Sequence, residues 1–396
     1  MELYLPIVNT IVGILALYLL LVSDKKVWFW SGAFIGLLWF WWISMSFRHY
    51  GFPWAMPIGV IGIALVYAVI FWFFAWFAQK VETRTMLSAL WIKALFLLLA
   101  SYIHPFGFDW FKPELLFVES YLGVEKWQFA LILLALCFSI LKSRTLYLSI
   151  ILLAYEPTQS IEASRDNSQV ELVTTNISID EKWNPDNLTQ QIDLVMQRID
   201  NALVDEKKLI VFPESVLPIF LNKELALLET LREKSERLAI VIGALNLDET
   251  IPRNSTFIFY RGKMIVANKV ILVPFGENNP LPDWLGDLVN DIFYDGAVDY
   301  EASSVITDYK IDDTIYRNAI CYEACSEALY RGEPKEMIVL SNNGWFTPSI
   351  QATQQRLLLE YYSRKYGTKI YHSVNKSASY IIEKGRVKES SLAPTK

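Results

Sequence analysis

Cysteine and histidine are scarce in this sequence of 396 residues, which contains three of each. Three cysteines, Cys137, Cys321 and Cys325, are too few to staple a disulfide scaffold. The histidines are scattered along the chain and show no metal-ligand spacing, so we expect no metal centre. No cofactor-binding motif appears either, and we expect no cofactor.

A surplus of positive charge is also absent. The 36 basic residues are outnumbered by 42 acidic ones, which gives a formal net charge of −6 and argues against a nucleic-acid partner. Hydrophobic residues make up 53% of the chain, too many for an ordinary soluble globule. Residues 1–155 carry little charge, whereas most charged residues follow position 156. This asymmetry predicts a membrane half followed by a soluble half.

Six apolar runs in the first half approach the roughly 20 residues that a membrane-spanning helix needs. They are 5–22, 27–47, 56–78, 87–103, 127–141 and the short run 145–155. We therefore predict a polytopic α-helical membrane domain over residues 1–155, with about six transmembrane helices embedded in a lipid bilayer. The short last run also fits an interfacial or tilted segment, and both interpretations stay open.

Basic residues gather in alternate short loops, at 25–26, 80–84 and 142–144. Because such loops tend to stay in the cytoplasm, six spans would place everything after residue 156 outside the cytoplasm. Without the sixth span, the same domain would lie in the cytoplasm. The orientation therefore depends on whether 145–155 crosses.

The second half begins with a polar linker at 156–169 and continues with alternating strand-like and helix-like runs to about residue 390, before a short tail at 391–396. The strand-like runs are 169–177, 208–213, 238–244, 255–260, 263–273, 314–321, 336–341, 369–374 and 378–383. The helix-like runs are 186–203, 222–236, 323–331 and 348–366. This alternation predicts a layered α/β domain over 170–390.

Three of the strand-like runs carry a reactive side chain. Glu214 follows a buried strand, where a carboxylate suits a general base. Lys269 interrupts an apolar run and needs a counter-charge if it is buried. Cys321 lies between a strand and a helix-like run, whose N-terminus would lower the thiol pKa. Taken singly, each residue has an ordinary structural explanation as a turn carboxylate, an edge lysine or an inert buried thiol.

The order Glu, Lys, Cys resembles the nitrilase (carbon–nitrogen hydrolase) superfamily, and the sequence contexts at 212–215, 268–270 and 320–323 match it. With a membrane domain in front, the chain resembles the apolipoprotein N-acyltransferase family within that superfamily. This second resemblance is most specific at Val-Pro-Phe-Gly-Glu, 273–277, and at Ser-Asn-Asn-Gly-Trp-Phe, 341–346.

The resemblance implies an α-β-β-α sandwich and ping-pong acyl transfer. Glu214 would act as base, Cys321 as the nucleophile that forms a thioester, and Lys269 with the backbone N–H of Tyr322 as the oxyanion site. A phospholipid would donate the acyl chain, and the α-amine of a diacylglyceryl-cysteine on an apolipoprotein would accept it. The setting would be a bacterial inner membrane, with the catalytic domain in the periplasm.

Seven further positions match the family: Glu277, Tyr322, Glu323, Trp183, Asn254, Trp345 and Phe346. Glu277 would orient Lys269 or share its charge, and Trp345 and Phe346 are candidates for the wall of an acyl-chain pocket. The ordinary alternatives are core packing for the aromatics, a helix-start carboxylate for Glu323 and a turn residue for Asn254.

Two other functions compete with acyl transfer. A membrane-anchored amidase or nitrilase would use the same triad and release ammonia in place of lysophospholipid. A non-catalytic membrane scaffold would have no need of all three triad residues. We expect Cys325 to be a free, partly buried thiol, because a disulfide to Cys321 would disable the nucleophile. Residues 375–377 replace a glycine-containing turn of the family, so we expect a local loop change there.

Overall fold

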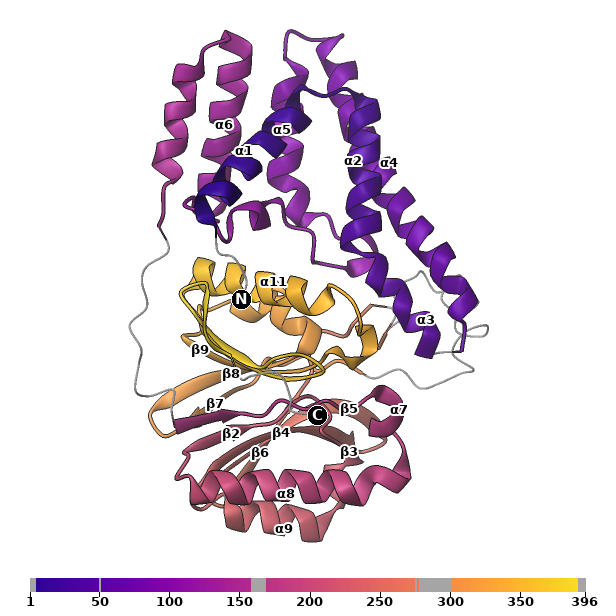
Figure 1. Cartoon of the computed structure of the whole chain (residues 1–396), viewed down its shortest axis with the longest axis vertical. Helices are drawn as coiled ribbons and strands as arrows, with labels where there is room; N and C mark the ends of the chain where they lie inside the picture. The colour runs from indigo at the N-terminus through magenta and orange to yellow at the C-terminus, as the bar shows by residue number, and fades with distance from the viewer. Residues whose placement is uncertain (1–4, 50, 158–168, 275, 278–300, 391–396) are drawn as a thin grey trace. The chain divides into compact units, whose positions relative to one another are not determined.

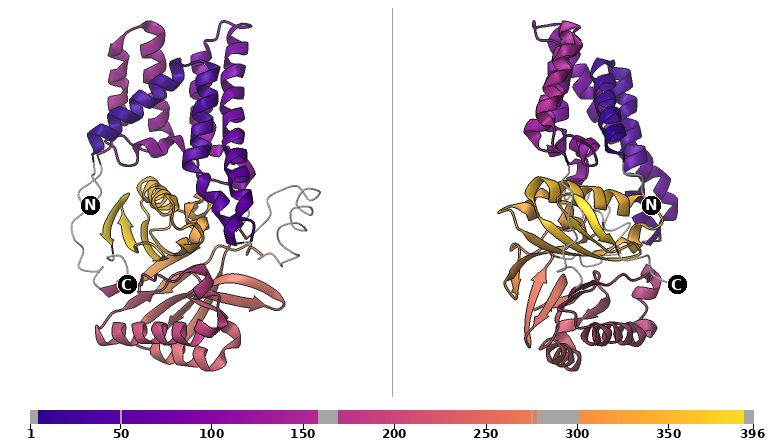
Figure 2. Two further views of the ribbon diagram at one scale, coloured as in Figure 1. Left: turned by 45° about the vertical axis from the view of Figure 1, so that its right-hand side comes forward. Right: turned by 60° about the vertical axis from the view of Figure 1, so that its left-hand side comes forward.

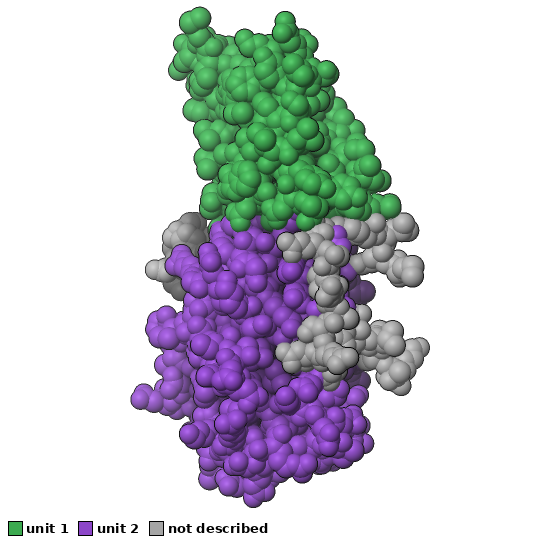
Figure 3. Space-filling model, turned by 90° about the vertical axis from the view of Figure 1, so that its left-hand side faces the viewer, with its two compact units in different colours: residues 1–159 green, residues 160–396 purple. Residues whose placement is uncertain are grey.

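The computed structural model describes residues 5–49, 51–157, 169–274, 276–277 and 301–390. The chain divides into two compact units, residues 1–159 and 160–396 (Figure 3). Most of the predicted linker (158–168) and the predicted tail (391–396) lie outside the described residues.

The first unit is helical, and a helix lies at each predicted apolar run. These helices are α1 (Pro6–Val22), α2 (Lys25–Trp39), α4 (Met56–Glu82), α5 (Ala89–Leu99), α6 (Lys126–Lys142) and the 3₁₀ helix η6 (Thr145–Ala154). The helix Pro53–Glu82 alone is long and apolar enough to cross a bilayer within the described residues, and a pair bent by 46°, Lys25–Trp39 with Trp41–His49, would be a second. The count of six spans stays a prediction.

Helices α2 and α4 pack closely because α2 presents glycine at the contact. A Cβ on Gly32 would lie 2.3 Å from the backbone oxygen of Tyr67, and one on Gly36 would lie 2.6 Å from the Cα of Ala64. Small residues allow such close approach between membrane helices. Beside this contact, the buried ring of Trp28 lies 5.6 Å from that of Phe71.

Helix α6 and η6 form an antiparallel hairpin (Figure 1). The N–H of Gly123, just before α6, donates to the carbonyl of Ala154 at 2.8 Å, and the N–H of Glu156 donates to the carbonyl of Tyr121 at 2.9 Å. The end of η6 therefore lies beside the start of α6. The chain therefore enters α6 and leaves η6 at the same end of the hairpin.

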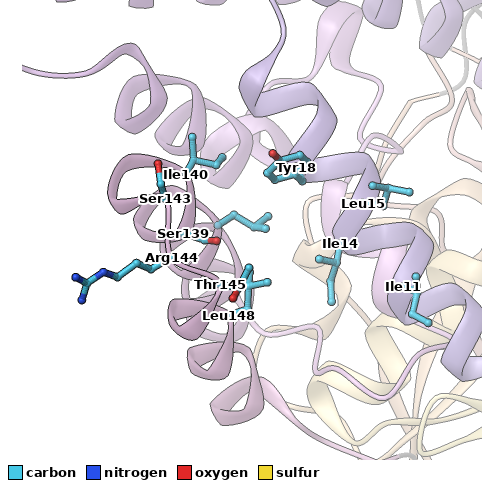
Figure 4. Close-up of a pocket in the computed structure, with 11 residues that line it drawn as sticks. Ile11, Ile14, Leu15, Tyr18, Ser139, Ile140, Ser143, Arg144, Thr145 and Leu148 are labelled. Atoms are coloured by element: carbon cyan, nitrogen blue, oxygen red, sulfur yellow. The ribbon is translucent and has the colours of Figure 1, made fainter.

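An apolar cavity of about 630 Å³ lies between α1 and this hairpin. Ile14 and Tyr18 of α1 face it across from Leu148, whereas the guanidinium of Arg144 points away from it (Figure 4). All its lining residues belong to the first unit, and none is a predicted site residue.

The second unit contains two sheets that face each other (Figures 1 and 2). The first sheet has the order β1-β2-β4-β5-β6, with β3 also paired to β4, from β1 (Val170–Leu172), β2 (Leu209–Val211), β3 (Leu217–Phe220), β4 (Ala239–Asp248), β5 (Ile251–Tyr260) and β6 (Lys263–Asn268). The second has the order β12-β11-β10-β9-β8-β7, from β7 (Asp308–Ile311), β8 (Thr314–Ile320), β9 (Glu336–Asn342), β10 (Lys369–Asn375), β11 (Tyr380–Glu383) and β12 (Arg386–Ser390).

Helices cover the outer face of each sheet, which gives the predicted α-β-β-α sandwich. Helices α8 (Leu188–Val204) and α9 (Leu225–Lys234) lie on the first sheet, and α11 (Gln351–Tyr366) lies on the second (Figure 1). Successive residues of a strand point to opposite faces, so Ile210 packs toward the helices while Leu209 and Val211 pack toward the second sheet. Burial on both faces explains why these strands read as continuous apolar runs.

Some predicted boundaries are wrong. The helix predicted at 323–331 is two short 3₁₀ segments, η10 (Cys321–Cys325) and η11 (Glu327–Tyr330), separated by the extended residue Ser326. The strand predicted at 263–273 ends at Asn268, because the N–H groups of Val270 and Ile271 bond to the Glu323 side chain and not to a neighbouring strand. Strand β1 covers only three residues of the predicted 169–177.

Candidate active site

Glu214 lies on a tight turn just after the buried strand β2. The next residue, Ser215, has a φ of 46°, a left-handed conformation uncommon outside glycine. The turn packs directly on β4, where a Cβ on Gly243 would lie 2.6 Å from the Ser215 nitrogen and 2.8 Å from the Glu214 Cα. Gly243 is therefore required for the turn to approach β4 this closely. The Glu214 side chain is largely buried, so its carboxylate needs local partners.

Lys269 follows β6 and supplies the charge partner. Its side chain is 1% exposed, and its Nζ lies 2.6 Å from Glu277 Oε2 and 3.6 Å from Glu214 Oε1. Burial by itself lowers the pKa of Lys269, but the carboxylates of Glu277 and Glu214 together raise it above its ordinary value. The buried lysine thus finds the counter-charge that the sequence requires, and it remains an ammonium.

Asn254, on β5, links the two carboxylates. Its Nδ2 donates to Glu214 Oε1 at 2.8 Å and to Glu277 Oε1 at 3.1 Å, while its backbone oxygen accepts from the Lys269 N–H at 2.9 Å. Glu277 Oε2 also accepts from the Val273 N–H at 3.0 Å. The four side chains of Glu214, Asn254, Lys269 and Glu277 therefore form one connected network.

Cys321 lies at the end of β8, with a φ of 55°. Burial and the neighbouring Glu214 carboxylate raise the pKa of the Cys321 thiol above its ordinary value, against the lowering effect of Lys269. The prediction that a helix N-terminus would lower this pKa is wrong, because Cys321 begins only the five-residue 3₁₀ segment η10. The sulfur therefore rests as a thiol and needs a base, and Glu214 is the carboxylate that acts on it most strongly.

Glu323 links the end of β8, next to Cys321, to the segment that follows Lys269. Its Oε1 accepts from the Ile320 N–H at 2.7 Å, and its Oε2 accepts from the N–H groups of Val270 at 2.7 Å and Ile271 at 3.0 Å. Burial raises the pKa of Glu323 to about 7, opposed by Lys269 and these donors. The carboxyl group therefore bridges the two sheets. A carboxylate that only began a helix, the ordinary alternative for Glu323, would bond within its own segment.

The four remaining predicted positions are all aromatic. Tyr322 is buried beside the nucleophile, whereas Trp183 is 38% exposed at the end of α7 (Ile179–Lys182). Trp345 and Phe346 lie half-buried on the 3₁₀ segment η12 (Asn343–Phe346). A role for these aromatics in an acyl-chain pocket stays a prediction. Cys325 takes part in no disulfide among the described residues, as expected, but its side chain is fully buried and not partly buried.

Sequence reasoning missed three polar residues near the site. Lys182 donates from Nζ to the backbone oxygen of Glu214 at 3.0 Å. Asn342 and Asn375, at the ends of β9 and β10, bond to each other at 2.8 Å, and Asn375 also accepts from the Ile177 N–H at 3.0 Å. For the two asparagines, the available signal was that each of two buried parallel strands ends in an asparagine. After Asn375, Lys376 has a φ of 71°, which suits the glycine expected in that turn.

This arrangement combines a base, a thiol and a fixed ammonium. A thiol that attacks a carbonyl needs a group to remove its proton and a positive charge near the developing oxyanion. Glu214 and Lys269 have those properties, and both act on the thiol of Cys321 electrostatically. The geometry therefore suits acyl transfer through a covalent thioester.

Comparison with known proteins gives the same indication. The profile of the apolipoprotein N-acyltransferase integral membrane domain matches residues 1–158. The apolipoprotein N-acyltransferase of Wolinella succinogenes is 40% identical over 381 residues, which cover 95% of this chain and 90% of the relative. That of Helicobacter pylori is 35% identical, with 93% and 86% covered.

Solved structures resemble this chain more distantly. One is a CN-hydrolase superfamily protein from Xanthomonas campestris, solved with an arsenic adduct in its active site. Its TM-score is 0.43 and its sequence identity is 15%, and the match covers 57% of this chain and 86% of that protein's chain. An amidase from Nesterenkonia has a TM-score of 0.43 and 10% identity, with the same two shares covered.

Proposed function

Because the chain belongs to the apolipoprotein N-acyltransferase family, we propose that it moves a fatty acyl chain from a phospholipid to the α-amine of a diacylglyceryl-cysteine on an apolipoprotein. The chain is an acyltransferase with a membrane domain. The observation that supports the proposal most is the buried network of Glu214, Asn254, Lys269 and Glu277 beside Cys321.

In the first half-reaction, Glu214 takes the proton of the Cys321 thiol, and the thiolate attacks the ester carbonyl of the phospholipid. Lys269 and the N–H of Tyr322 stabilise the tetrahedral oxyanion, and one donor of that kind contributes about 3–4 kcal/mol in other enzymes. The ester C–O bond then breaks. Glu214 returns the proton to the leaving alkoxide, which gives a lysophospholipid and an acyl thioester on Cys321.

In the second half-reaction, the α-amine of the acceptor attacks the thioester carbonyl while Glu214 takes an amine proton. The C–S bond breaks, the amide forms, and the proton returns to the sulfur. Asn254 and Glu277 keep Glu214 and Lys269 in place through both halves, because each contacts a group that must not move.

We also propose that the catalytic domain lies on the periplasmic side of the bacterial inner membrane. The hairpin of α6 and η6 supports this, since the residues before α6 are hydrogen-bonded to the residues at the end of η6. If α6 crosses the membrane, then η6 crosses back, as the orientation with the basic loop 142–144 in the cytoplasm requires.

The amidase alternative uses the same triad but gives no reason for the matching membrane domain. Mass spectrometry of Cys321 separates the two functions. After incubation of the full chain with phospholipid in detergent, we expect an acyl adduct on Cys321 and release of lysophospholipid, both lost in Cys321→Ala. An active preparation that transfers acyl chains without ever carrying this adduct would refute the mechanism. Ammonia released from small amides, with no lysophospholipid, would favour the amidase.

A further inference from the structure

Lys182 is a second buried cation near the site, and the mechanism above does not use it. Its side chain is almost completely buried, with 1% of the residue exposed. Its Nζ donates to the backbone oxygen of Glu214 at 3.0 Å. Burial lowers the pKa of Lys182 to about 8, although the nearby Glu214 and Cys321 favour its charged form. A buried amine that is this costly to charge calls for a functional explanation.

The backbone around Lys182 is held on both sides. The Ser178 side chain accepts from the Glu181 N–H at 3.3 Å, and Glu181 Oε2 accepts from the Ser178 N–H at 2.9 Å, which caps α7 reciprocally. The carbonyl of Lys182 accepts from Gln191 Nε2 of α8 at 3.1 Å. Just before α7, Asn375 of the second sheet binds the N–H of Ile177. The lysine is therefore presented to the site from a fixed position.

The turn that carries Glu214 is constrained from two directions. Gly243 of β4 lets it approach the first sheet, and Lys182 binds its carbonyl oxygen. A left-handed residue, Ser215, follows immediately. Because such a conformation is unfavourable by itself, the turn persists only where its surroundings hold it.

We propose that Lys182 is a positioning residue for the general base: it fixes the Glu214 turn by its hydrogen bond, and its ammonium charge stabilises the Cys321 thiolate that forms when the thiol proton passes to Glu214. This inference rests on the proposed thioester function. Lys182 supplies a second positive charge in a site where Lys269 pairs with the two carboxylates of Glu214 and Glu277.

The proposal predicts a pH dependence of acylation. The titratable groups that act on Lys182 are Glu214, beyond β2, and Cys321, on η10. Behind Glu214 lie the pair of Lys269 and Glu277. Beyond Lys269, Glu323 binds the two N–H groups that follow it, at residues 270 and 271. Lys182 is protonated below pH about 8 and loses its charge above it, so the acylation rate should fall in that range.

The test is the single-turnover rate of Cys321 acylation by phospholipid, measured between pH 6 and 10 on the full chain in detergent. Two variants separate the two roles of the lysine. Lys182→Gln retains a hydrogen-bond donor without charge, and Lys182→Met retains neither. Lys365→Met is the matched control, because Lys365 is a part-buried lysine paired with Glu327 at 2.5 Å, outside the network around Cys321.

We expect Lys182→Met to slow acylation at pH 7 at least tenfold, and both Lys182 variants to lose the fall in rate above pH 8. Lys365→Met should keep the wild-type rate and profile. If one Lys182 variant fails to fold in a thermal melt, the other still reports the profile. Variants that keep the wild-type rate, or that are slower with an unchanged alkaline fall, overturn the inference. A wild-type chain that forms no adduct overturns the proposed function itself.

Discussion

Removal of the ammonium at Lys269 tests the central charge arrangement of the site. In Lys269→Met the apolar stem keeps nearly the same length, so the change is mainly the loss of one positive charge. The carboxylates of Glu214 and Glu277 then remain in a buried site, with Asn254 as their shared donor. Removing one partner of a buried ion pair costs about 3–5 kcal/mol, because the other partner is left without compensation.

This loss is large enough to measure. For a domain of about 150–250 residues, 1 kcal/mol shifts the melting temperature by roughly 2–4 °C, so we expect a decrease of roughly 6–20 °C for the catalytic unit. Scanning calorimetry of the full chain in detergent measures it. The double variant Lys269→Met with Glu277→Gln should recover part of the decrease, since one of the two carboxylates is then neutral.

The control is Lys388→Met, which breaks the more exposed pair of Lys388 with Glu383, joined at 2.8 Å. A pair of that kind contributes about 0–1 kcal/mol, so its melting temperature should change by a few degrees at most. Equal melting of Lys269→Met and the wild type would contradict the reasoning, because it would mean that the carboxylates do not need the ammonium. A double variant less stable than the single one would contradict it as well.

Two further substitutions test the positions of the base and the nucleophile. Gly243→Ala would put a methyl group 2.6 Å from the Ser215 nitrogen, so the base turn must move; we expect acylation of Cys321 to slow at least tenfold by mass spectrometry, and a wild-type rate would show that the close approach is unimportant. Glu323→Gln puts an NH₂ group where an oxygen accepts from backbone N–H groups; we expect a stability loss of about 1–3 kcal/mol in denaturant unfolding, and no loss would mean that the bridge is not structural.

The alternation of apolar runs was sufficient to predict a layered α/β domain, whereas the sandwich of two sheets came from the resemblance to the nitrilase superfamily. Strands such as β2 and β4 are buried on both faces and therefore stand out as apolar runs. Short elements were missed, because α7 and β3 have four residues each and four residues carry too little periodicity to identify them.

The errors near Cys321 have a physical cause in long-range contacts. The run 323–331 has helical composition, but Glu323 is drawn to N–H groups of Val270 and Ile271, more than fifty positions earlier. Tertiary hydrogen bonds therefore override the local preference, and the thiol loses the helix N-terminus that was expected to acidify it. Lys182 was missed because it appears in the sequence only as a lysine in a polar segment. Its burial and its contact with the Glu214 carbonyl arise from the tertiary fold.

The long-range contacts also explain how the site holds its geometry. Glu214, Asn254 and Lys269 come from the first sheet, whereas Cys321 and Glu323 follow β8 of the second. The two sheets share an apolar core, in which Val211 and Val241 pack with Ile338 and Leu340. At the site this packing is supplemented by hydrogen bonds across the sandwich, through Glu323.

The position of the Cys321 thiol relative to Glu214 and to Lys269 is therefore set by the packing of one sheet on the other. Substitutions in the shared core far from Cys321 should consequently slow acylation as well as lower stability, because a shift of about 1 Å in reacting groups costs on the order of 100-fold in rate. Ile338→Ala offers this test, with the single-turnover acylation rate measured well below the melting temperature of the variant. A normal rate in that destabilised variant would show that the contacts of Glu323 alone maintain the geometry.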